Sequence, residues 1–288
     1  MKKSIGLWLL LVILLPVSGY AQFQLRDVND KTVELLDNGS PVFDFNYGMM
    51  LKPGVNPDRT RCCYLSPVHA PNGVVITDDF PKDHPHHRGI FWAWPVVKVE
   101  GKTYDLWTIK GIHAHFTKWL TREAHHDSAT LSFQDRWFVG DRPVVEEQVT
   151  ITAHPAKSGE RNIDFTISLK ALVDGVEIAG QPDERKGYGG LSIRFAPRTD
   201  TVLTTPDNKN APDSNLTPEP WAQLTGNFNG REAGARITID PSNPGYPNDW
   251  CLRHYGFVGV NYPGLASVKL STTKDLTMKY RVTLLGKS

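Results

Sequence analysis

The sequence predicts an all-β protein built as a large antiparallel β-sandwich. After Gln22 the dominant hydrophobic period is two residues, and segments 32–36, 129–133 and 161–169 alternate apolar with polar side chains. Such alternation is typical of half-buried strands. Turn sequences with Asn-Gly or Asp-Gly separate these segments, and no segment keeps an apolar stripe of period 3.6 for three turns. We expect fifteen or more strands, which favours two large facing sheets because open sheets beyond about ten strands split or curl.

The first 21 residues have the pattern of a signal peptide. Two lysines precede an unbroken apolar run over residues 5–15, and small residues stand before Gln22. A membrane-spanning helix needs about 20 apolar residues, whereas Pro16 ends this run. The sequence therefore predicts a periplasmic or secreted protein, cleaved between Ala21 and Gln22 and free of the membrane after cleavage.

The remaining residues, 22–288, are expected to form one domain. Large β-sandwiches reach this size as single units, and the polar segment 207–220 is interpreted as a long surface loop because strand-like segments flank it. Without the two lysines of the leader, the 32 basic residues become 30, against 31 acidic ones. This near-neutral balance argues against nucleic acid as a partner.

The cysteines define no disulfide framework. Cys62 and Cys63 are adjacent and would bond each other only with strain, so a bond from either one to Cys251 is the alternative. At least one thiol then stays free, and we assign no catalytic role to any of the three.

The densest group of chemically active side chains is Asp83, His84, His86, His87 and Arg88. If residues 89–94 form a strand entered from a loop, positions 84, 86 and 88 share one face and position 87 takes the other. Imidazoles transfer protons near neutral pH. A functional role is therefore favoured over one in which the rings only tie a loop to a sheet.

A second pair, His113 and His115, also shares a face if its segment is a strand. The pair is a candidate for binding substrate. In the metal alternative, either this pair or His84 and His86, with a carboxylate, holds a divalent metal as in cupins. No glutamate follows either pair at the spacing that such metal sites commonly use. A solvent-facing pair without function is the alternative.

Glu147 falls on what periodicity marks as the apolar face of its strand, together with Val145 and Val149. Asp135 lies in a similar set with Phe133 and Trp137. An unpaired buried charge is costly, so Glu147 is expected to pair with an arginine, to be protonated, or to face a cleft. The candidate partners are Arg136, Arg142 and Arg194.

The segment 240–256 is rich in turn residues followed by polar and aromatic ones. Aromatic rings beside charged side chains suit sugars, which present apolar C–H faces and a rim of hydroxyls. Core packing is the alternative for each tryptophan. The substrate-binding candidates here and nearby are Trp107, Asn243, Asp249, Trp250 and Arg253, and His254 is a further catalytic candidate.

Motifs at residues 83–89, 187–194, 240–243 and 253–257, with Trp250, together resemble a bacterial family of unknown function that is often labelled "methane oxygenase PmoA". The resemblance covers most of the mature chain. A methane monooxygenase subunit resembles a multi-span membrane protein, and this sequence has no such span. Members of the family resemble the galactose-mutarotase-like sandwich and are associated with bacterial sugar catabolism. The resemblance thus implies a fold and a class of substrate, but it implies no mechanism.

The leading hypothesis is a carbohydrate-active enzyme with epimerase, lyase or hydrolase chemistry that needs no cofactor. One of the three clustered histidines acts as general acid, and Glu147 or another histidine acts as base. Arg88 and Arg253 hold hydroxyls or a carboxylate of the sugar, with Asp83 and Arg194 as further binding candidates. The serine-hydrolase, phosphate-binding and dinucleotide motifs are missing. The alternatives are a metal-dependent sugar enzyme and a non-catalytic carbohydrate-binding module.

Overall fold

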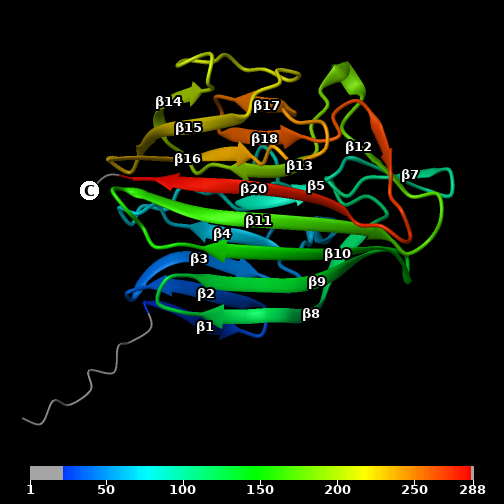
Figure 1. The fold of residues 1–288 in the computed structure, drawn as a ribbon, viewed down its shortest axis with the longest axis horizontal. Coiled ribbons are helices and arrows are strands. Elements are labelled where there is room, and N and C mark those ends of the chain that lie inside the picture. The colour runs from blue at the N-terminus through cyan, green and yellow to red at the C-terminus, as the bar shows by residue number, and fades with distance from the viewer. Residues whose placement is uncertain (1–21, 287–288) are drawn as a thin grey trace, which may run out of the picture.

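A computed structural model describes residues 22–286, and the predicted signal peptide lies outside these residues. Two eight-stranded sheets pack face to face and a four-stranded sheet lies at one end (Figure 1). The first sheet contains, in spatial order, β1 (Phe23–Asn29), β2 (Thr32–Asp37), β3 (Ser40–Asn46), β4 (Tyr64–Val68), β5 (Ile90–Ala93), β13 (Gly190–Arg194), β18 (Phe257–Asn261) and β17 (Asp249–Arg253).

The second sheet contains β14 (Thr199–Thr204), β15 (Trp221–Phe228), β16 (Arg231–Ile239), β20 (Leu276–Leu285), β11 (Glu160–Ala171), β10 (Arg142–Ala153), β9 (Ala129–Val139) and β8 (His113–Ala124). The small sheet contains β19 (Ser267–Lys269), β12 (Glu177–Ala179), β6 (Val96–Val99) and β7 (Lys102–Tyr104). Two 3₁₀ turns, η1 (Pro57–Arg59) and η2 (Asp183–Arg185), complete the elements of the described chain.

The prediction of a large antiparallel sandwich is confirmed. The pairs within the large sheets are antiparallel, as in β9 with β10 and β10 with β11. Segment 207–220 lies in the connection between β14 and β15, as expected for a loop. Within residues 22–286, no helix has the length and apolar character needed to cross a membrane.

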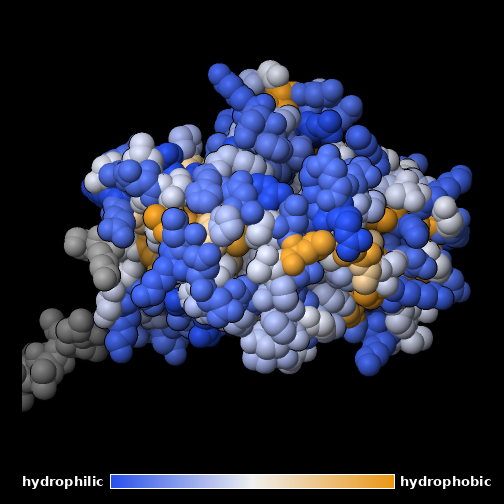
Figure 2. Space-filling model, turned by 90° about the horizontal axis from the view of Figure 1, so that it is seen from above, coloured by the Kyte–Doolittle hydropathy of each residue, from blue (hydrophilic) through white to orange (hydrophobic). Residues whose placement is uncertain are grey.

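The core lies between the two large sheets, where inward side chains of alternating residues interdigitate. Phe45 of the first sheet contacts Phe133 of the second with ring centroids 4.7 Å apart, and Trp92 reaches Phe165 at 6.3 Å. β11 shows the predicted alternation, with Ile163 among its buried residues. The face seen in Figure 2 is mainly hydrophilic, with apolar side chains only in small groups.

Strand β2 departs from the half-buried pattern, because all six of its residues are buried. Its outer face carries Glu34, which pairs with Arg26 and lies opposite Asp44 on β3. Burial and the neighbouring Glu34 carboxyl raise the pKa of Asp44 to about 6. Polar neighbours therefore cover the face that the alternation assigned to solvent.

Candidate functional site

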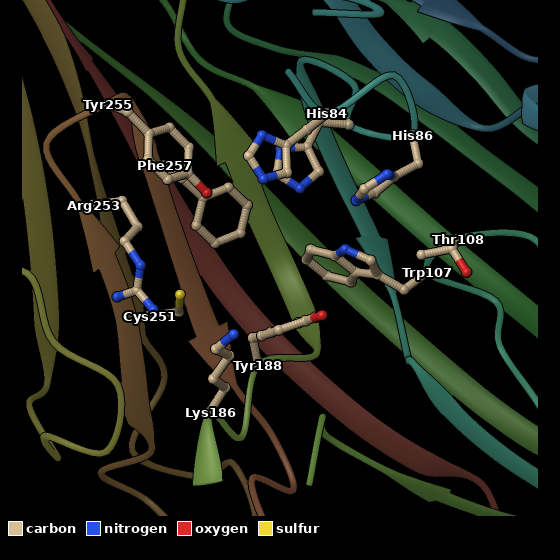
Figure 3. Close-up of a pocket in the computed structure, with 11 residues that line it drawn as sticks. His84, His86, Trp107, Thr108, Lys186, Tyr188, Cys251, Arg253, Tyr255 and Phe257 are labelled. Carbon is tan, nitrogen blue, oxygen red and sulfur yellow. The ribbon is translucent and has the colours of Figure 1, made fainter. Parts of the chain in front are cut away.

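A pocket of about 260 Å³ opens among connections of the first sheet (Figure 3). We call it the histidine pocket. The β4–β5 connection supplies the histidines, and the other walls come from the connections after β7 and β12 and from strands β17 and β18 with their turn. It is lined by His84, His86, His87, Trp107, Thr108, Lys186, Tyr188, Cys251, Arg253, Tyr255 and Phe257.

The three histidines stand on a tight turn just before β5 and not on a strand. The backbone N–H of His87 donates to the carbonyl of His84 at 2.9 Å, which closes the turn. All three imidazoles therefore reach the pocket, whereas Arg88 does not. The expectation that position 87 faces away from positions 84 and 86 is wrong, because the two-residue alternation of a strand does not apply in a turn.

Arg88 fixes this turn from behind and is fully buried. Its guanidinium donates to the backbone carbonyls of Pro85 and His87 at 2.9 and 2.7 Å and also to that of Arg59. It lies over the ring of Phe80 and 3.5 Å from the carboxylate of Asp79. The structure thus places Arg88 as a positioning residue rather than at the pocket.

Gly89 allows the turn to enter β5 close to β4. A Cβ at this position would lie 2.1 Å from the carbonyl oxygen of Leu65, so only glycine fits without moving the strand. Arg88 and Gly89 therefore hold the histidine turn in two ways: the guanidinium bonds to backbone carbonyls of the turn, and the glycine lets the chain pass close to β4.

The imidazole rings lie against one another. The ring of His84 is 4.6 Å from that of His87 and 5.7 Å from that of His86, and the rings of His86 and His87 are 4.6 Å apart. Burial, with the nearby cations Arg61 and Arg59 and with His84, lowers the pKa of His86 to about 3. Burial and the other two imidazoles lower the pKa of His87 well below its ordinary value. Both rings are therefore neutral at neutral pH.

His84 is positioned by a carboxylate at the rim. Its Nδ1 lies 3.0 Å from Oδ2 of Asp83, and its ring stacks on Tyr255 at 5.2 Å. Asp83 in turn accepts two hydrogen bonds of 2.8 Å from Arg194. Asp83 and Arg194 do not line the pocket, but they hold His84 and Tyr255 from outside it.

Aromatic rings form the other walls. Trp107 is buried and its ring lies 5.0 Å from that of Tyr188 and 5.9 Å from that of Phe257. Figure 3 shows these rings around the open space, with Lys186 and Arg253 at the side away from His86. Sequence reasoning missed six of the lining residues as site residues: Thr108, Lys186, Tyr188, Cys251, Tyr255 and Phe257. The motifs at 187–194 and 253–257 contained the signal for three of them.

A second, much smaller cavity of about 20 Å³ lies next to the histidine pocket, and we call it the carboxyl cavity. Its lining comprises Thr60, Arg61, Cys62, Cys63, Trp92, Leu106, Ile109, His113, Ala114, Asp135 and Glu147. The two hollows share a wall, because residues 106 and 109 face the carboxyl cavity while 107 and 108 face the histidine pocket. Arg61 donates to the carbonyls of Leu106 and Trp107 and so holds this wall.

Glu147 and Asp135 lie directly opposite each other on β10 and β9. Both are buried, as the apolar-face pattern indicated, and Glu147 accepts a hydrogen bond of 3.2 Å from the indole of Trp137. Burial raises the pKa of Glu147 to about 7, and burial together with the Glu147 carboxyl raises that of Asp135 well above its ordinary value. The arginine partners that we considered are engaged elsewhere: Arg136 with Glu146, Arg142 with Glu100 and Arg194 with Asp83.

The remaining sequence candidates lie apart from the histidine pocket. His113 lines the carboxyl cavity and His115 is exposed on β8. His254 is exposed and its Nδ1 lies 2.7 Å from Asp213. Asn243 fastens β20 through the backbone of Lys279, Trp250 is a core residue bonded to the carbonyl of Glu219, and Asp249 is half-buried on β17 outside the pocket lining.

The positions of the histidines and cysteines bear on two further alternatives, a metal site and a disulfide bond. His84 and His86 line the histidine pocket while His113 faces the carboxyl cavity, and no three metal-ligating side chains among residues 22–286 gather into a metal-binding group. All three cysteines are free thiols. The predicted bond to Cys251 is therefore absent, because Cys251 lines one hollow and Cys62 and Cys63 line the other.

Comparison with known families shows which family the chain belongs to, but the activity of that family is unknown. The family described as "Family of unknown function (DUF6807)" matches residues 32–287. The chain belongs to this family. The prediction of a family of unknown function is confirmed, whereas the methane-oxygenase label is not part of this match and stays a resemblance.

Comparison of this DUF6807 member with characterised proteins gives little more. No curated protein matches the chain. Among solved structures it is similar to that of a galactose mutarotase related enzyme from Lactobacillus acidophilus, with 8% sequence identity over 92% of this chain and 97% of that chain, and a TM-score of 0.41. A similarity this low supports no inference about activity.

Proposed function

We propose that the histidine pocket is the active site of an exported enzyme that transfers protons on a small sugar. The observation that carries the proposal is the meeting of three imidazoles, with ring centroids 4.6 to 5.7 Å apart, at one wall of a pocket whose other walls are aromatic. Aromatic rings suit the C–H faces of a sugar ring, and imidazoles suit proton transfer near neutral pH. The leader-like residues 1–21 support the exported location.

The imidazoles take complementary roles in this proposal. In this scheme His84, oriented by Asp83 at 3.0 Å, donates a proton to the substrate, and the adjacent His86 or His87 takes one from it. Glu147 lines the neighbouring cavity, so the base role that sequence reasoning gave to it passes to a second imidazole.

The residue types favour epimerase or lyase chemistry over ordinary glycoside hydrolysis. Most glycosidases place two carboxyl groups on either side of the bond that they break. None of the eleven residues that line the histidine pocket, all within the described chain, is an aspartate or glutamate. Anomer interconversion needs only an acid and a base, and so do epimerisation and elimination at a carbon next to a carbonyl or carboxyl group; imidazoles provide both roles.

The test is to substitute the acceptor imidazole and measure turnover. Wild-type protein is first screened by NMR against neutral, oxidised and unsaturated monosaccharides for anomerisation, epimerisation and elimination. His86→Gln is then expected to lower the turnover of the active sugar by about 100-fold or more, the usual contribution of general acid–base catalysis. Its Tm should change by only about 2 °C, because the amide keeps a polar group at the half-buried position.

His126→Gln is the matched control, because His126 is an exposed histidine after β8, away from the pocket lining. Its turnover should equal that of the wild type. Wild-type turnover in both His86→Gln and His84→Gln would overturn the proposed function.

A further inference from the structure

We propose that the sugar bound in the histidine pocket carries a carboxylate, as a uronic acid does, and that Lys186 and Arg253 bind this group. The inference rests on the proposed function and names its substrate class. Its starting point is the lining itself, which contains these two cationic side chains and no acidic one. A pocket with this composition favours an anionic ligand over a neutral one.

The charge of Arg253 has no acidic partner in the described chain. Its Nη1 donates to the carbonyls of Ser214 and Leu252 at 2.7 and 2.8 Å, and its Nη2 donates to the side-chain carbonyl of Asn215. These acceptors are neutral, and no ion pair with an aspartate or glutamate forms among residues 22–286. The guanidinium is therefore held in place while its positive charge stays available to a ligand.

Two arginines next to the pocket show the contrast. Arg194 donates to Asp83 at 2.8 Å, and Arg88 lies 3.5 Å from Asp79, so both have carboxylate partners within the protein. Asp213, the acidic residue on the loop beside Arg253, bonds instead to the backbone and ring of His254. The protein thus neutralises the arginines that position the site and leaves the one that lines it without a counterion.

Lys186 has a partner that a ligand can replace. Its Nζ lies 2.9 Å from Glu184, whose side chain is 77% exposed on η2. Ion pairs at such exposed positions contribute little because water competes for both partners. A carboxylate bound within the pocket can take the place of Glu184 without leaving a buried charge unpaired.

The opposite wall adds to the positive potential. Arg61 and Arg59, which form no ion pair with an acidic residue within the described chain, act on His86, and Arg61 also acts on His87; each lowers the pKa of the imidazole. Positive charge therefore lies close to His86 and His87 although these two imidazoles are themselves neutral. A negative charge on the ligand is favoured at either end of the pocket, but only Lys186 and Arg253 line it as permanent cations.

The arrangement also orients the sugar. Figure 3 places Lys186 and Arg253 on one side of the space, His84 and His86 on the other, and Trp107 and Tyr188 between them. A ring lying on the aromatic side chains would direct its carboxylate to the two cations and its opposite edge to the imidazoles. The reactive carbon is accordingly predicted on the edge of the ring away from the carboxylate.

The experiment compares sugars that differ only in the carboxylate. Binding of D-glucuronate and D-galacturonate to the full protein is measured by calorimetry beside D-glucose and D-galactose at the same ionic strength. Wild-type protein is expected to bind one uronate at least tenfold more tightly than its neutral counterpart, since a hydrogen bond to a charged group gives at least this factor. Added salt should weaken the uronate and not the neutral sugar.

Charge-removing variants locate the carboxylate. Lys186→Gln and Arg253→Gln should each reduce the preference for the uronate by about tenfold and leave binding of the neutral sugar within about twofold. Lys118→Gln, on the exposed side of β8, is the matched control and should keep the full preference. Arg253→Lys retains the charge and is the second variant if the glutamine substitution disturbs the loop that bonds to Arg253; it should keep part of the preference.

The outcomes separate the two proposals. Equal binding of uronate and neutral sugar, or a uronate preference that survives both charge-removing variants, would overturn this inference while the proposed function stood. Failure of all four sugars to bind wild-type protein would count against the proposed function itself, and the inference would fall with it.

Discussion

The histidine pocket and the carboxyl cavity share a wall but are built in different ways. The three histidines stand on a turn held by Arg88, whereas Asp135 and Glu147 stand opposite each other on two long paired strands. The first region thus depends on side-chain bonds to a loop, and the second on the backbone ladder of a sheet. A substitution that releases the histidine turn can therefore abolish turnover while the sandwich stays folded.

Burial acts on the two regions with opposite electrostatic results. Burial favours the unprotonated form of His86 and His87 in the pocket and the protonated form of Asp135 and Glu147 in the cavity, because in each case the neutral form is favoured away from water. One region therefore resists gaining protons and the other resists losing them. Stability should respond to pH in opposite directions through the two regions.

The largest effect is expected from replacing Arg88, whose guanidinium holds the histidine turn. Arg88→Met leaves three backbone carbonyls without their buried donor and Asp79 without the cation 3.5 Å away, which should cost about 3 kcal/mol of unfolding free energy and abolish turnover. Denaturant unfolding measures the first and the sugar assay the second. Arg122→Met removes an exposed pair with Asp27 and should cost at most about 1 kcal/mol. Wild-type turnover in Arg88→Met would show that the turn is not held in this way.

The next effect is the opposed pH dependence. Because the pKa of Glu147 is raised to about 7, the folded state binds more protons than the unfolded state between about pH 4.5 and 7, and stability falls as pH rises through this window. The change is on the order of 2 kcal/mol. Glu147→Gln, which still accepts from Trp137, should flatten this side of the profile in urea unfolding experiments.

His86 acts in the other direction. Its pKa is lowered to about 3, so the unfolded state binds more protons between about pH 6.5 and 3, and stability falls as pH falls through that range. His86→Gln should therefore flatten the acid side while leaving the Glu147 contribution in place. Identical pH profiles for the two variants would contradict the separation of the two regions.

The smallest effect is predicted for the second histidine pair. His115 is exposed on β8 and lines neither hollow, so His115→Gln should change turnover by less than about twofold and unfolding free energy by less than about 0.5 kcal/mol. A loss of turnover comparable to that of His86→Gln would show that His115 on β8 belongs to the active site.

Particular residues show how far the candidate site was predictable. The cluster at 84–87 was found because three imidazoles in four positions stand out in any context. Burial of Glu147 and Asp135 was found because both share the two-residue period of their apolar neighbours. Lys186 was missed because nothing local distinguishes a lysine in a loop that turns toward a pocket from one that turns to water. Tyr188 and Tyr255 stand in the motifs at 187–194 and 253–257, but the sequence alone did not show that their rings face the pocket.

The sequence by itself determined the sandwich, since strand alternation and turn residues are local signals that do not depend on distant partners. It could not decide which polar residues meet. Glu147 and the histidines were expected to act together, but residues 106–109 separate the two hollows in which they lie. Arg88 was expected to bind the sugar, but it donates to backbone carbonyls instead. Those outcomes depend on loop conformation and on contacts between residues far apart in the chain, which only tertiary packing fixes.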